Sequence, residues 1–251
     1  MARLYPHKGR FCARPLDSAG YIYRMTDKLA LYYAPDNASL CVRLALVHLN
    51  VSFDTVLVDR TQSAQSSPAY LAMNPNGQIP TLCTPDGPIY ETAAILLWLA
   101  DNHAGEVFPA PQDATRGHAL KWLFWLSNTL HPAMRMLFYP QKYIGYDAVP
   151  DLTAALRDQL ARHMAHLEAH APWLDDDLGI LAFYLAPMLR WSAIYGAGPR
   201  WFEIEQFPRL LAFAKRVEQT ETSHQASLAE GLGQSIFSAP RLPNPPEGSA
   251  L

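Results

Sequence analysis

The chain has little charge, no cluster of basic residues and no long hydrophobic run. Only 17% of its 251 residues are charged, and its formal net charge is -3. A slightly acidic chain without a Lys and Arg cluster offers no surface for a phosphate backbone, which argues against nucleic-acid binding. The longest uncharged stretch, residues 178–189, is too short to span a bilayer and includes a glycine and a proline. We therefore expect a packed globular protein without a membrane segment.

Cysteine is also scarce. Cys12, Cys41 and Cys83 are the three cysteines, and they show neither CxxC spacing nor a Cys/His pattern that suits zinc. An odd number without such spacing argues against a disulfide framework and against a metal site. This cysteine usage is typical of a reducing compartment, so the predicted location is the cytoplasm.

Proline, by contrast, is abundant, with 21 residues, and its placement divides the chain. Two prolines and a glycine mark a linker before residue 113, and the end of the chain holds four prolines without an apolar period. The basic N-terminus lacks the apolar core of a secretory signal. We predict an N-terminal extension at 1–26, one domain at 27–108, a second at 113–234 and a proline-rich tail at 239–251.

The two predicted domains differ in their apolar pattern. The first alternates short apolar or β-branched runs with helical spacing, which predicts an α/β domain. The second repeats apolar residues at helical spacing only, which predicts an all-α domain. In the first, strands are expected at 29–33, 52–58, 79–83 and 88–90, and helices at 39–49, 67–73 and 92–100. In the second, helices are expected at 115–139, 150–171, 178–195 and 207–219.

The segment Gly77–Leu82 places Pro80 directly before a strand. A proline there cannot donate to the strand ladder, so it belongs at an edge or in a cis bond. A cis bond would turn the N–H and C=O of Ile79 outward, ready to pair with an extended peptide-like ligand. The alternative is an ordinary trans proline at the start of a strand.

The segment Tyr90–Ile95 ends a strand and begins a helix with Thr92 as a cap. The free N–H groups of a helix start suit a ligand carboxylate. Glu91 is placed to pair with an ammonium group, so the amino-acid end of a ligand would satisfy both. The alternative is a plain helix cap beside a surface carboxylate.

The loop from Tyr33 to Ser39 leads from the first strand into the first helix. Donors at a helix N-terminus stabilise a thiolate, whose unperturbed pKa is about 8.5. The more common role of Asn37 and Ser39 is simply to cap the helix.

His131 is either a structural histidine or a general base. His163, His166 and His170 lie on the flank of a helical core stripe, so we expect a solvated rim there and no metal site.

This order of elements resembles the cytosolic glutathione transferase family. The resemblance covers residues 28–232 and is most specific at Asn74–Leu82 and Glu91–Ile95, which match N-P-x-G-x-[VI]-P-x-L and E-[ST]-x-A-I. It implies a thioredoxin-like α/β domain with a cis Pro80, followed by an all-helical domain. It also implies that glutathione, as co-substrate, binds at Gln78, Ile79 and Pro80, with its γ-glutamyl end at Glu91 and Thr92. His131 falls where beta-class members have a histidine lining the substrate pocket.

Two departures from the family pattern bear on the chemistry. Ala38 stands at the position of the beta-class cysteine, so mixed-disulfide chemistry is not expected there, and Tyr33, Asn37 and Ser39 remain as thiolate-stabilising candidates. The family's helix-capping box is absent at Gly179–Ala182, where Asp176 or Asp177 would have to cap instead.

The resemblance implies a transferase that adds the glutathione thiolate to a small apolar electrophile, needs no metal and forms a homodimer. The alternatives are a non-catalytic binding or interaction protein with the same fold and a glutathione-dependent reductase or dehalogenase. The expected contributors to the pocket or to packing between the domains are Trp122, Phe124, Trp125, Met134, Phe138 and Tyr139.

Overall fold

The computed structural model describes residues 28–103, 107–175, 178–196, 198 and 200–250. It also describes the two short antiparallel strands β1 (Ala13–Arg14) and β2 (Ile22–Tyr23). The rest of the predicted extension at 1–26 lies outside the described residues. Among those residues, no helix combines the length and the hydrophobicity needed to cross a membrane.

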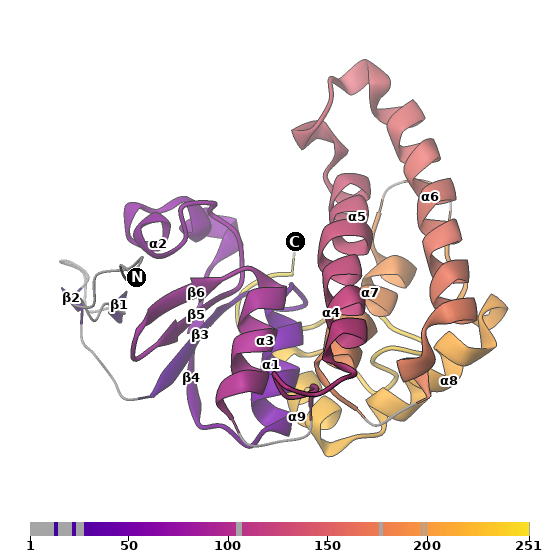
Figure 1. Ribbon diagram of the computed structural model, residues 1–251. Coiled ribbons are helices and arrows are strands. Elements are labelled where there is room, and N and C mark those ends of the chain that lie inside the picture. Colours follow the sequence, from indigo (N-terminus) through magenta and orange to yellow (C-terminus); the bar gives the residue numbers. More distant parts are fainter. Residues whose placement is uncertain are drawn as a thin grey trace, which may run out of the picture.

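The N-terminal part is built on a four-stranded mixed sheet in the order β4-β3-β5-β6 (Figure 1). β3 runs parallel to β4 and antiparallel to β5, with Leu31 opposite both Thr55 and Leu82. Because β3 has a neighbour on each side, four of its five residues are buried. The strands are β3 (Leu29–Tyr33), β4 (Phe53–Leu57), β5 (Thr81–Thr84) and β6 (Gly87–Tyr90).

Three helices accompany this sheet. α1 (Ser39–His48) and α3 (Thr92–Asn102) pack together and join the main core, whereas α2 (Pro68–Met73) contributes to a separate small cluster around Tyr32. α2 begins as its sequence predicts, because the Ser67 hydroxyl accepts the Tyr70 N–H at 3.2 Å. The predicted α/β domain is thereby confirmed.

The C-terminal part is helical, as expected, but its first predicted helix is interrupted. Leu126–Leu130 forms a π turn, in which the His131 N–H donates to the Leu126 carbonyl. Pro132 has no N–H for an ordinary helical bond, which explains the change of register at this point. The helices are α4 (Arg116–Trp125), α5 (His131–Phe138), α6 (Val149–His170), α7 (Ile180–Ile194), α8 (Pro208–Glu218) and α9 (Glu221–Glu230), the last not separately predicted.

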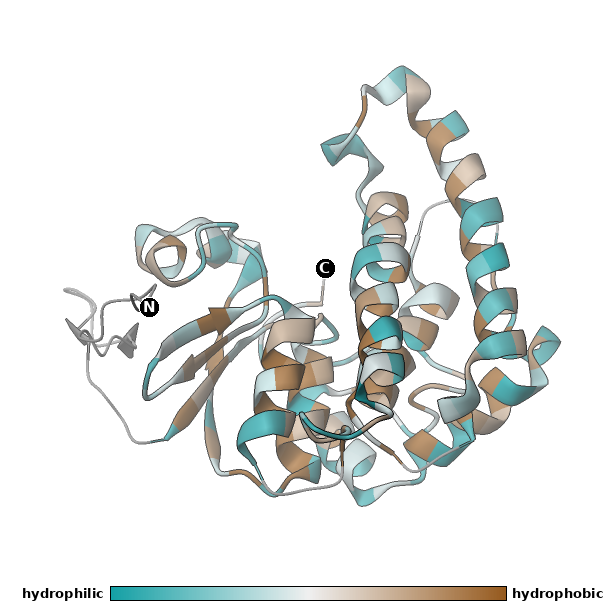
Figure 2. Ribbon diagram, in the orientation of Figure 1, coloured by the Kyte–Doolittle hydropathy of each residue, from teal (hydrophilic) through white to brown (hydrophobic). Residues whose placement is uncertain are grey.

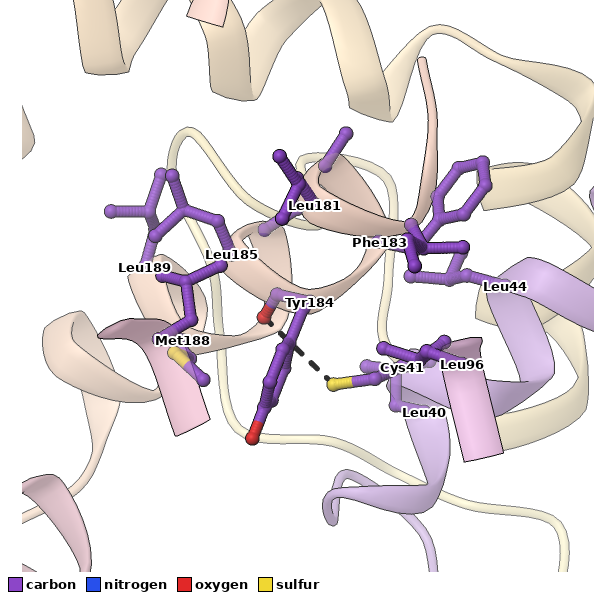
Figure 3. Packing of buried hydrophobic residues seen from close by; sticks show 14 of the residues in the cluster. Leu40, Cys41, Leu44, Leu96, Leu181, Phe183, Tyr184, Leu185, Met188 and Leu189 are labelled. Carbon is purple, nitrogen blue, oxygen red and sulfur yellow. Dashed lines mark hydrogen bonds between the residues drawn. The ribbon is translucent and has the colours of Figure 1, made fainter. Parts of the chain in front are cut away.

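α7 is the central helix and joins the two parts. Every residue from Ile180 to Ser192 is buried, and most of them are hydrophobic. Hydrophobic residues, brown in Figure 2, also recur along the neighbouring helices α1 and α3. It packs against α1, where the Cys41 thiol donates to the Tyr184 carbonyl at 3.9 Å (Figure 3). Burial raises the pKa of Cys41, which suits a packing role rather than a reactive one. Cys83 is disulfide-bonded, which contradicts the expectation that the cysteines form no disulfide, because sequence spacing does not report how near two thiols lie in space.

The start of α7 shows how the chain manages without the expected capping box. The Ile180 N–H donates to the backbone carbonyl of Val107 at 3.0 Å. A Cβ at Gly179 would lie 2.3 Å from that carbonyl oxygen, so only glycine permits the approach. The linker thus supplies the acceptor that a capping side chain would give, while Asp176 and Asp177 lie outside the described residues.

Candidate functional site

A cleft of about 530 Å³ opens between the sheet domain and the helical part. This volume lies in the range of roughly 300–1,000 Å³ that is typical of small-molecule sites. The sheet domain lines it with residues 36–38, 60, 65, 74, 77–80, 91 and 92. The helical part contributes residues 127, 131, 132, 135, 138, 139, 142, 143, 184, 191, 195 and 196, and the C-terminal segment contributes Ala250.

One wall of the cleft is the segment Asn74–Pro80. Its turn is fixed by the Asn74 side chain, which accepts the Asn76 N–H at 3.1 Å and donates to the Gln78 carbonyl at 2.7 Å. Gly77 has φ +59°, and a Cβ there would lie 3.1 Å from the Gln65 carbonyl oxygen. The Ile79–Pro80 peptide bond is cis. The N–H and C=O of Ile79 form no backbone hydrogen bond with the described part of the chain, so both are free to pair with a ligand in the cleft.

A second wall is the start of α3. Glu91 has φ +72°, a left-handed conformation that a non-glycine residue rarely adopts and that is concentrated at functional sites. Its side chain is exposed and does not cap the helix, whereas Thr92 is buried. The cleft therefore has a free helix N-terminus and a free carboxylate side by side, the pair that a ligand's amino-acid end requires.

The structure separates the three thiolate-stabilising candidates. Asn37 lines the cleft, and its amide donates to the Pro35 carbonyl at 2.9 Å and to the Ala250 carbonyl at 3.5 Å. The Ser39 hydroxyl is fully buried and bonded to the Ala34 backbone. Tyr33 is also buried and donates its hydroxyl to Glu247, and neither it nor Ser39 lines the cleft.

Asp36, which precedes Asn37, anchors this loop to the helical part. One carboxylate oxygen accepts from the Arg190 Nε at 2.9 Å and the Trp191 Nε1 at 2.8 Å, and the other accepts from the Tyr195 hydroxyl at 2.6 Å. The Arg190 side chain is fully buried, and its guanidinium also donates to the Ile236 carbonyl at 3.1 Å. Two residues of the last turns of α7 and the residue that follows the helix thus hold the loop that carries Asn37.

A second buried ion pair supports the same loop from α9. Glu230 is fully buried and accepts from the Arg43 Nε at 2.7 Å and from the Asp36 N–H at 2.8 Å. Burial raises the pKa of Glu230 above its usual value, while the Arg43 charge opposes that shift. The first loop of the sheet domain is therefore fixed by two helices of the other half.

His131 lies at the helical side of the cleft. Its Nδ1 is 3.0 Å from the Tyr184 hydroxyl, and its ring packs 5.8 Å from that of Trp191. Burial, assisted by the charge of Arg135, lowers the pKa of His131 to about 4. The imidazole is therefore neutral near pH 7 and serves as a hydrogen-bonding wall rather than as a cation.

The buried imidazole makes stability depend on pH. The pKa of this imidazole is 6.5 in the unfolded chain and about 4 in the folded protein. Its contribution to the free energy of unfolding is therefore fully present above pH 6.5 and is lost as the pH falls toward 4. When the pH falls from neutral to acidic, we expect the free energy of unfolding to decrease by about 2–3 kcal/mol less in His131→Gln than in the wild type. Urea unfolding at neutral and acidic pH measures the difference, with His118→Gln on the exposed face of α4 as control. Equal acid-induced losses in the wild type and in His131→Gln would contradict the assignment.

The C-terminal segment returns to the cleft (Figure 1). Glu247 accepts from the Tyr33 hydroxyl, Gly248 packs on Leu57 and Pro35, and the Ala250 carbonyl accepts from Arg60. The sequence predicts only a proline-rich tail here and no part in the site. Nothing local to the segment could have signalled this, since its partners lie some 200 positions earlier, as for Tyr33 and Glu247 at a separation of 214.

Only some of the aromatic residues expected at the pocket line the cleft. Phe138 and Tyr139 line the cleft, whereas Trp122, Phe124, Trp125 and Met134 do not. The His166 ring of α6 lies tilted against the Trp122 and Trp125 rings of α4, with centroid distances of 5.6 Å and 5.5 Å. Within the described residues, no group of three metal-ligating side chains gathers.

Comparisons with known proteins agree with this geometry. The family model "Glutathione S-transferase, N-terminal domain" matches residues 27–101. Glutathione S-transferase 1 of Schizosaccharomyces pombe is 42% identical over 206 residues, covering 77% of this chain and 87% of that protein. Glutathione S-transferase GST-4.5 of Xanthomonas campestris is 29% identical over 211 residues, covering 81% of this chain and all (100%) of that protein. A sphingomonad glutathione S-transferase solved with glutathione has a TM-score of 0.68 at 28% identity, covering 81% of this chain and 100% of its own.

Proposed function

Because the chain belongs to the glutathione S-transferase family, we propose that its cleft binds glutathione and joins the glutathione sulfur to a small electrophile. The observation that carries this proposal is the convergence of three features on one cleft. These are the unpaired Ile79 backbone, the start of α3 with Glu91, and Asn37 at the start of α1. Together they match the peptide, amino-acid and thiol parts of the tripeptide.

The polar groups of the cleft also match the charges of glutathione. The ligand has one ammonium and two carboxylates. In our proposal, Glu91 takes the ammonium and the N-terminus of α3, with Thr92, takes the adjacent carboxylate. Gln78, Ile79 and Pro80 face the peptide, and Arg60 is the cation on the same domain for the second carboxylate. Asn37 and the first turn of α1, which has no side-chain cap, face the sulfur.

In the proposed reaction these groups lower the pKa of the bound thiol, and the resulting thiolate attacks the electrophile. Ala38 offers no thiol at this point of the loop, so no covalent enzyme intermediate is involved. A non-catalytic binding protein would hold glutathione equally well, but it would leave the thiol pKa unchanged. The thiol pKa therefore distinguishes the two functions.

Glutathione affinity tests the role of Glu91. We expect Glu91→Gln to weaken binding by about tenfold, because a charge-assisted hydrogen bond to the ammonium is lost. Glutamine keeps the size of the side chain, which makes no helix-capping bond, so the melting temperature should barely change. Calorimetric titration measures the affinity, and Glu205→Gln at an exposed site outside the cleft is the control. Unchanged affinity in Glu91→Gln would refute this placement of the ligand.

We also propose a cytoplasmic homodimer, following the family resemblance. Phe124 on α4 has 52% of its surface exposed and is a plausible contact in such a dimer. Light scattering on the purified protein measures the oligomeric state, and a monomer at micromolar concentration would contradict the dimer.

A further inference from the structure

On the helical side of the cleft, two cations have no acidic partner among the described residues. Arg135 of α5 donates to the Tyr143 hydroxyl, and its guanidinium lies 5.5 Å from the centre of that ring. The Lys142 ammonium lies 4.8 Å from the centre of the Tyr139 ring. Within the described part of the chain, neither side chain forms an ion pair. By contrast, Arg43, Arg190 and Arg116 each pair with a carboxylate.

The acidic residues of the cleft do not compensate these charges. Asp36 is already bonded to Arg190, and Glu91 lies at the start of α3 on the glutathione wall. The third cation of the cleft, Arg60, donates to the Tyr139 hydroxyl at 3.1 Å and to the Ala250 carbonyl, and both acceptors are uncharged. The helical side of the cleft therefore has a surplus of positive charge.

This surplus of positive charge has an electrostatic cost. Burial together with the charges of Arg135 and Arg60 lowers the pKa of Lys142. Like charges near one another destabilise each other, and an anion placed between them relieves the repulsion. Glutathione supplies two carboxylates, which the proposed binding mode assigns to α3 and Arg60. Arg135 and Lys142 are then left for another ligand.

The same region is aromatic. Phe138, Tyr139 and Tyr143 line the cleft around the two cations. Aromatic faces pack well against a flat ring, and the two cations, each held over one of these tyrosine rings, select a charged substituent on it. An apolar ligand would use the rings but would leave both cations unpaired.

Building on the proposed transferase function, we propose that the electrophile is an aromatic carboxylate whose ring packs on Tyr139 and Tyr143 and whose carboxylate pairs with Arg135 and Lys142. This replaces the simple apolar electrophile of the sequence-based prediction with an anionic one. In the test reaction, the thiolate attacks the chlorine-bearing carbon of a chloronitrobenzoate. A C–S bond forms, the C–Cl bond breaks and chloride leaves, while the thiol proton passes to solvent.

The test compares two probes of similar size and different charge, a chloronitrobenzoate and the corresponding chloronitrobenzamide. We expect kcat/KM for the benzoate to exceed that for the benzamide by about tenfold after correction for their reactivities with free glutathione. Lys142→Gln and Arg135→Gln should each reduce this preference severalfold, and Lys142→Arg should retain it. Lys215→Gln, an exposed position on α8 outside the cleft, should leave the preference unchanged.

Direct binding makes the test independent of turnover. Calorimetry of each probe, with the protein saturated by S-methylglutathione, should show tighter binding of the benzoate and the same sensitivity to Lys142→Gln. Equal affinity for both probes overturns this proposal even if the protein is an active transferase. Preferential binding of a second S-methylglutathione at Lys142 also overturns it. Failure of glutathione itself to bind overturns the proposed function, and the two probes are then compared by calorimetry on the protein without S-methylglutathione.

Discussion

Replacing Asp36 with asparagine is expected to lower the free energy of unfolding by about 3–5 kcal/mol, because it leaves a buried arginine without its counter-charge. The Arg190 side chain has no exposed surface, and its Nε lies 2.9 Å from the Asp36 carboxylate. Trp191 and Tyr195 donate to the same carboxylate, so they too would lose a charged acceptor. The substitution therefore affects every bond that holds the loop to α7.

Asparagine matches aspartate in size and in backbone preference, so neither explains the expected loss of unfolding free energy in Asp36→Asn. Asp36 has φ +51°, and asparagine is among the few residues that adopt this conformation readily. Asp101→Asn is the matched control, since it breaks a partly exposed pair with Arg116, whose N to O distance is also 2.9 Å. That change should cost under about 1 kcal/mol. Urea unfolding followed by tryptophan fluorescence measures both, and similar small losses would show that the buried pair does not hold the two parts together.

Asn37→Ala is expected to lower kcat/KM for conjugation by about tenfold to a hundredfold, the equivalent of one hydrogen bond to a charged group. Asn37 is the one sequence-predicted thiolate candidate that lines the cleft. Its amide has two donors, and the one that reaches the Ala250 carbonyl spans 3.5 Å, the weak end of the hydrogen-bond range. A thiolate can replace that carbonyl as acceptor at little cost.

Ser39→Ala is the control for this experiment. The Ser39 hydroxyl bonds only with the Ala34 backbone and is fully buried. Its removal should cost about 1 kcal/mol of stability and leave the pKa of the bound thiol unchanged. A loss of rate in Ser39→Ala that matches the loss in Asn37→Ala, with both proteins folded, would contradict the assignment of Asn37.

The parts of the site that the sequence predicts well are contiguous in the chain. Asn74–Pro80 sets its own turn through the Asn74 side chain, and Glu91 and Thr92 form one helix start. Such features follow from local backbone chemistry, so their residue types identify them. The expected glutathione wall accordingly comes together around one cleft.

The parts that the sequence does not predict depend on distant partners. Asp36 and Arg190 are 154 residues apart, and neither stands out in its own segment. Tyr33 is likewise bonded to Glu247, 214 residues away. Ser39 is the exception, since its bond to the Ala34 backbone is local. The charge surplus at Arg135 and Lys142 emerges only once the positions of the carboxylates are known. Periodicity and motif spacing contain none of this information.

The pKa of the glutathione thiol in the complex is the most direct test of the account. Thiolate absorbance in the ultraviolet, followed against pH with the wild-type protein in excess, reports it without any electrophile. We expect a thiol pKa about one to two units below the free value of about 8.5. A bound thiol that titrates as in free solution would contradict the central claim that this cleft activates glutathione.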